Sequence, residues 1–98
     1  MTDFILLMHV DTTSTPASEA WDAYFSRLAS LGVFDGGSAI GKGAVYRKAG
    51  PAGPSSGHID GYIRVRAASL AAARALLEGN PVYECGGSVE IRELPRDD

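Results

Sequence analysis

The segment Phe4 to Val10, FILLMHV, is apolar on both faces of an extended chain except at His9. Such a strand is shielded from water on both sides, which is typical of the middle of a sheet. A chain of 98 residues can bury one core and little more. The sequence therefore predicts one domain, residues 1–98, with this segment inside its sheet.

Two amphipathic helices are expected after this strand. The first begins near Thr15-Pro16, with Thr15 as N-cap, and ends at Gly32. Ser69 caps the second helix, and Asn80-Pro81 stops it. Their expected buried residues are Trp21, Tyr24 or Phe25, Leu28 and Leu31 in the first helix, and Leu70, Ala73, Leu76 and Leu77 in the second.

Three further regions read as strands. The first, Val33 to Ile40, is interrupted by glycines that indicate a bulge or a close backbone approach, and Ala44 to Lys48 continues it or forms a separate strand. Residues 49–57, AGPAGPSSG, are expected to be a flexible loop, a mobile hairpin connection. The remaining strands are His58 to Arg66, which alternates, and Ser88 to Leu94.

This order, β-α-β-β-α-β, predicts an α+β fold, the ferredoxin-like sandwich with two helices on one face of an antiparallel sheet. The other face is then solvated or covered by a partner. On this open face the first strand contributes apolar side chains and the other strands contribute charged ones. Such a mixed face suits a homodimer in which the two sheets enclose a cavity. The expected polar residues of this face are His58, Asp60, Tyr62, Arg64, Glu90 and Arg92.

Composition excludes several classes of protein. The net charge of −3 and the lack of a basic block argue against a nucleic-acid partner. The longest apolar run, Phe4 to Met8, is too short to span a membrane, and no basic segment precedes it as in a signal peptide. A lone Cys85 leaves no disulfide framework and fits the cytoplasm.

Two His-x-Asp pairs are candidates for acid-base chemistry. His9 with Asp11, and His58 with Asp60, have the spacing that puts side chains about 7 Å apart on one face of a strand. The alternatives are a strand-end histidine followed by a turn, and a cross-strand charge network with Glu90 and Arg92. We expect no metal, because the chain has only these two histidines.

Beyond the second pair, Tyr62 and Arg64 extend the row along the same strand, where Arg64 can hold an anion. This row predicts a binding site for a small molecule in which Asp11, Asp60, Tyr62 and Arg64 contact the ligand.

The blocks FILLMHVD, LASLGVFDGGSAI and GYIRVRAASLAAARALLEGNP followed by GGSVEIREL resemble the YCII-related, DGPF-like family. The resemblance implies a dimeric α/β-barrel and, in the YCII branch, cofactor-independent chemistry by a His-Asp pair. Asp35 stands where the YCII-type aspartate is expected, whereas the family's histidine falls near Ala20 or Trp21. The Asp-Gly-Pro-Phe stretch is replaced by residues 49–57 and His58-Ile59-Asp60.

Three functions remain open at this point. The first is an enzyme acting on a small organic molecule, with His9, Asp35 and His58 exchanging protons. The second is a non-catalytic binding or regulatory module on the same dimer, which the missing helix histidine favours. The third is a polar face that serves only as a dimer interface.

Overall fold

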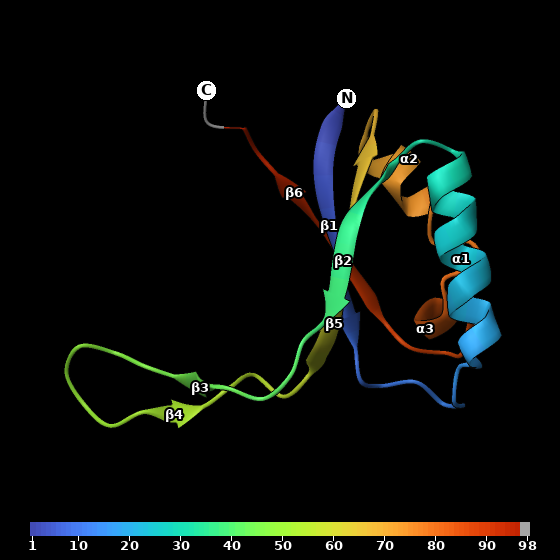
Figure 1. Cartoon of the computed structure of the whole chain (residues 1–98). Coiled ribbons are helices and arrows are strands. Elements are labelled where there is room, and N and C mark those ends of the chain that lie inside the picture. The colour runs from blue at the N-terminus through green and yellow to red at the C-terminus, as the bar shows by residue number, and fades with distance from the viewer. Residues whose placement is uncertain (97–98) are drawn as a thin grey trace.

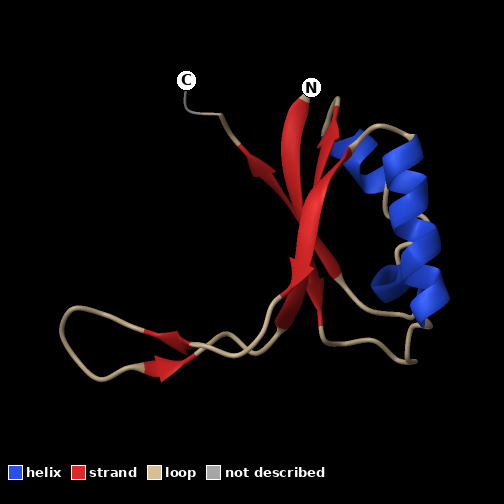
Figure 2. Cartoon of the chain, in the orientation of Figure 1, coloured by secondary structure: helices blue, strands red, loops and turns tan. Residues whose placement is uncertain are grey.

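The structure is a computed structural model that describes residues 1–96, arranged as a sheet covered on one side by helices (Figures 1 and 2). The chain is of the α+β class, as predicted. Its elements are β1 (Thr2–His9), α1 (Ser18–Ser30), β2 (Phe34–Ala39), β3 (Ala44–Val45), β4 (Gly53–Pro54), β5 (Ile59–Ala67), α2 (Leu70–Ala75), α3 (Pro81–Glu84) and β6 (Val89–Leu94).

The main sheet has four antiparallel strands in the order β2-β5-β1-β6, and β1 lies inside it as its apolar sequence predicted. Phe4, Leu6 and Met8 of β1 are buried beneath the helices. Ile5 and Leu7 alternate with them and are half-buried on the opposite face. This arrangement is compatible with a ferredoxin-like fold.

The helix α1 packs on the sheet through Tyr24 and Leu28, and Gly32 follows it with a φ of +72°. The expected stripe is wrong at one position, because Leu31 is 52% exposed. The start of the helix also differs from the prediction. It begins three residues after Thr15, and its N-cap position, Ala17, has no side-chain hydrogen bond.

The second helical region is two short helices instead of one. Ser69 caps α2 as expected, and its hydroxyl accepts a hydrogen bond from the backbone N–H of Ala72. Leu70, placed in the buried stripe, is 60% exposed. The expected stop at Asn80-Pro81 is wrong, because α2 ends at Ala75. Asn80 instead caps α3: its side-chain oxygen accepts hydrogen bonds from Val82 N and Tyr83 N, and Pro81 occupies the first turn.

Residues 40–58, called the arm below, extend away from the sheet on the side opposite the helices (Figure 1). In the arm, β3 and β4 pair only with each other, so residues 49–57 are not all loop as expected. The predicted bulge lies in β2, where the register with β5 shifts between Phe34 and Gly37. A Cβ on Gly37 would lie 2.6 Å from the carbonyl oxygen of Tyr62, which confirms the close backbone approach.

Candidate functional site

A cavity of about 580 Å³ lies at the end of the sheet where β1 ends and β5 begins. Trp21 and Phe25 of α1 border it with their rings stacked, 5.7 Å apart between centroids. Its volume lies within the range of small-molecule sites. Its other apolar residues include Met8, Ile63 and Val82, and its polar ones include His9, Thr12, Ser38, Asp60 and Tyr62.

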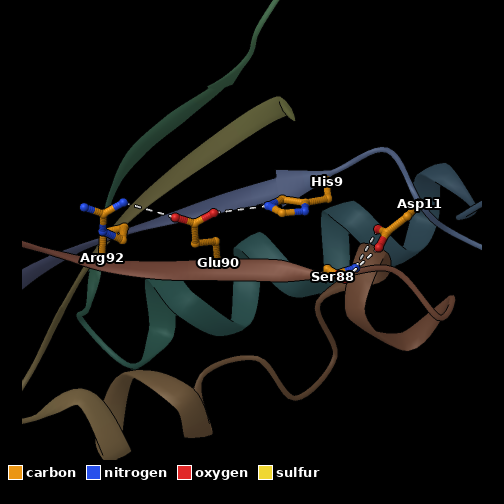
Figure 3. A network of polar contacts seen from close by, with 5 residues as sticks. All are labelled: His9, Asp11, Ser88, Glu90 and Arg92. Carbon is orange, nitrogen blue, oxygen red and sulfur yellow. Dashed lines mark hydrogen bonds and ion pairs between the residues drawn. The ribbon is translucent and has the colours of Figure 1, made fainter. Parts of the chain in front are cut away.

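At the rim of this cavity, His9 belongs to a chain of three polar side chains (Figure 3). Its Nε2 lies 3.3 Å from Oε1 of Glu90, and Oε2 of Glu90 accepts a hydrogen bond of 3.2 Å from Arg92 Nη1. The hydrogen bonds from Arg92 and from His9 lower the pKa of the Glu90 carboxyl, which keeps it ionised at neutral pH. An ionised carboxylate only accepts hydrogen bonds, so in this contact Nε2 of His9 is the donor, and Nδ1 takes no part in it.

The second histidine, His58, is the last residue of the arm, directly before β5. Its side chain lies against that of His9. The two rings meet edge to face, with 5.2 Å between their centroids. The predicted alternation that led to Asp60 and Tyr62 is interrupted here, because the register of β1 and β5 shifts between Met8 and His9. Asp60 is the extra residue of this bulge, and it borders the cavity together with Tyr62.

Asp35 and Arg64 form a separate pair on the sheet. Their side chains lie 3.9 Å apart, and both are about half exposed. Arg64 pairs across the sheet with Ile5, which is four residues from His9 along β1, or about 13 Å at 3.3 Å per residue. The structure therefore brings His9 and His58 together and places Asp35 outside that group.

Asp11 holds two connections of the chain together instead of facing His9 (Figure 3). Its carboxylate accepts hydrogen bonds from the backbone N–H of Ser88 at 2.8 Å and from the Ser88 hydroxyl at 2.6 Å. These bonds lower the pKa of the Asp11 carboxyl. Beside them, Thr13 N and Thr13 Oγ1 both donate to the carbonyl of Cys85. Asp11 thus fixes the loop that enters α1 against the start of β6.

Sequence reasoning missed the partner of His9 and the place of Phe25 at the cavity. Glu90 was placed in a charge network but not beside His9. The central position of β1 was the signal that could have found Glu90, because a central strand has a neighbouring strand on each side. In the structure Glu90 of β6 pairs with Leu7, which lies two residues from His9 and on the same face of β1. Trp21 and Phe25 were assigned to the helix core, with a cavity wall as the alternative for Trp21, and both are half-buried at the cavity.

Comparison of the chain with protein-family models and with curated proteins finds no match. Within residues 1–96, no group of three or more His, Cys, Asp or Glu side chains is arranged to hold a metal ion. In the same part of the chain, no helix is long and apolar enough to cross a membrane.

Proposed function

We propose that the chain is a YCII-related domain that works as a homodimer and acts on a small, largely apolar organic molecule without a metal or cofactor. The observation that carries the proposal is the cavity walled by Trp21 and Phe25 with His9 at its rim. Aromatic walls favour a planar or aromatic ligand, because stacked and edge-to-face contacts add to the apolar surface buried.

In this proposal, His9 is the general base. A histidine held through one ring nitrogen by a carboxylate presents the other nitrogen for proton transfer, and Glu90 supplies that carboxylate at 3.3 Å. The side chain of His9 is 24% exposed, so the ring is within reach of a ligand at the rim. The adjoining ring of His58 restricts the orientation of His9 from a second direction.

A homodimer follows from the open face of the sheet. Ile5 and Leu7 form a half-buried apolar centre on that face, and Arg64 and Glu90 flank it. The helices cover only the other face (Figure 2). A second copy of the sheet would bury the apolar centre, which supports a dimeric α/β-barrel.

A second candidate function, binding without reaction, is favoured by the direction of the His9 side chain. Met8 and Ile63 point from the sheet into the helix side, where Trp21 and Phe25 lie. His9 follows Met8 in β1 and bonds Glu90, which places its imidazole toward the opposite face. A ligand held among the aromatic rings would then contact His9 only at the rim.

Binding can be tested by the fluorescence of Trp21, the only tryptophan of the chain. Titration with phenol, benzoate and hydroquinone should give a saturable change for at least one compound. Val82→Phe, which fills the cavity from a residue 6% exposed, should weaken that binding at least roughly tenfold. Leu70→Phe, at a 60% exposed position of α2, is the control. Equal binding by both variants would contradict the cavity as the site.

Catalysis can be tested on any compound that binds, by following its conversion with mass spectrometry. His9→Gln should reduce turnover by roughly 10²–10⁴-fold with binding retained, because a general base contributes on that scale. Arg74→Gln, in the exposed last turn of α2, is the control for protein quality. A compound that binds and is never altered by the wild type would establish the binding module instead.

A further inference from the structure

The arm, residues 40–58, has little to hold it in place within its own chain. All its residues are exposed except Gly53, which is partly exposed. Its two ends are joined to the sheet, because Ile40 N donates to the carbonyl of Asp60 and the carbonyl of His58 accepts from Val10 N. Between these ends the strand pairing is that of β3 with β4, two residues each, and a two-stranded hairpin alone is marginally stable in water. The radius of gyration is 14.9 Å, against about 13 Å for a compact chain of this length.

The surface of the arm has the chemistry of a contact region. Ile40 and Val45 are each 43% exposed, and Tyr46 is 80% exposed. Tyrosine is among the residues enriched in protein interfaces, where its ring is buried and its hydroxyl finds a polar partner. The arm therefore offers an apolar group that nothing else in residues 1–96 covers.

The charge of the arm is opposite to that of the rest of the chain. Lys42, Arg47 and Lys48 lie in it, and no Asp or Glu occurs between Asp35 and Asp60. The chain has nine basic and twelve acidic residues, so the remainder has six basic and twelve acidic ones, a balance of −6. The net charge of the arm is thus opposite in sign to that of the rest of a second copy of the chain, which favours contact between the two.

The direction of the arm agrees with this partner. It leaves the sheet on the face opposite the helices (Figure 1), which is the face proposed above to meet a second sheet. A protomer seated on that face would lie beside the arm. In a two-fold dimer each arm makes the same contact, so the complementary charges are used twice.

We propose that the arm of each protomer clasps the acidic body of a second copy of this chain, and that Tyr46 and the three arm cations make this contact. The inference rests on the homodimer of the proposed function and adds the element that holds it together. Three cations on an acidic chain are too few for nucleic acid to be the favoured partner.

The first experiment measures the dimer dissociation constant by sedimentation at 50 and 500 mM NaCl. The wild type should dimerise, and more weakly at high salt, because exposed charge pairs are screened. The variant with Lys42→Glu, Arg47→Glu and Lys48→Glu should have a dissociation constant at least roughly tenfold higher at low salt. The single variant Arg47→Glu should also weaken the dimer. Its matched control is Arg74→Glu, the same change on the exposed surface of α2, which should leave the dissociation constant unchanged.

A second measurement finds the contact directly and does not depend on the folding of a variant with altered charge. A photoreactive benzoyl-phenylalanine replaces Tyr46, and the protein is prepared as a mixture of ¹⁴N- and ¹⁵N-labelled copies. Cross-linked peptides that combine the two labels show that the arm reaches the other copy. Cross-links within one label only, or to added RNA but not to a second copy, overturn the proposal.

The outcomes separate this inference from the proposed function. A wild type that is monomeric at all concentrations overturns both the homodimer and the arm contact. A dimer that is equally stable in the wild type and in the charge-reversed variant, without cross-links from position 46, overturns the arm contact alone. Loss of the dimer in the Arg74→Glu control as well as in Arg47→Glu would also refute a specific role of the arm.

Discussion

The hydroxyl of Tyr24 makes a hydrogen bond that ties the cavity wall to the rest of the fold. Tyr24 is 2% exposed, and its Oη donates to the carbonyl oxygen of Leu76 at 2.7 Å, which joins α1 to the end of α2. The same helix carries Trp21 and Phe25 at the cavity. Tyr24→Phe removes this bond and leaves the ring and its packing in place.

The size of the effect follows from the burial of the two atoms. A neutral hydrogen bond contributes about 0.5–1.5 kcal/mol to stability, and a carbonyl left without a partner costs further free energy. Leu76 is only partly buried, so water can replace some of the lost bond. We expect the free energy of unfolding to fall by about 1–2 kcal/mol, which lowers the melting temperature by about 5–10 °C in a domain of this length.

The assay is urea denaturation at pH 7, with Tyr46→Phe as the control because that side chain is 80% exposed. Burial raises the pKa of Tyr24, so above pH 10 the unfolded chain loses this proton while the folded chain keeps it. The free energy of unfolding of the wild type should therefore fall as the pH rises through 10, and more steeply than that of Tyr24→Phe. If the wild type and Tyr24→Phe are equally stable at pH 7, and their free energies of unfolding fall equally with pH above 10, the reasoning is refuted.

Two further predictions concern the backbone and the acid range. Gly37→Ala should lower the free energy of unfolding, measured in urea, by about 1–3 kcal/mol, because its Cβ would clash with a backbone carbonyl of β5. Gly41→Ala is the control, because a Cβ there meets nothing within 4 Å and stability should not change. Equal losses of stability in the two variants would refute the clash. Hydrogen bonds from Ser88 lower the folded-state pKa of Asp11, so their stabilisation is present above about pH 4 and is lost as the pH falls through the folded pKa. Asp11→Asn should thus show a smaller loss of stability between pH 5 and pH 3 than the wild type and the Asp22→Asn control, and an unchanged acid slope would argue against the Ser88 contact.

Local patterns predicted those parts of the fold that local physics determines. The apolar faces of β1 placed it inside the sheet, and Gly32 ends α1 in the left-handed conformation that a side chain disfavours. Ser69 caps α2 as its position before an apolar run indicated. At Asn80-Pro81 the local chemistry has two interpretations, because a pair that can stop one helix is also a good start for the next. The structure uses only the second, since α2 already ends at Ala75 and Asn80 caps α3.

The candidate site depended on long-range register, which a single sequence does not contain. A bulge at Asp60 ends the alternation on which the row from His58 to Arg64 was based. The pairing of β2 with β5, which sets Phe34 opposite Val65, places the next residue, Asp35, beside Arg64 instead of near the histidines. The contact between His9 and Glu90 joins residues 81 positions apart, so it required the pairing of β1 with β6.

The central position of β1 also determines the order in which the sheet can be completed. As the chain is synthesised, its most apolar segment comes first, but its neighbours β5 and β6 begin only at Ile59 and Val89. Until then, both edges of β1 have unpaired backbone groups, and its two apolar faces lack their cover. Folding of this kind depends on contacts distant in sequence, which makes it slow and exposes a strand that can pair with other chains. The feature that stabilises the finished sheet is therefore the one that makes the nascent chain most dependent on protection from aggregation.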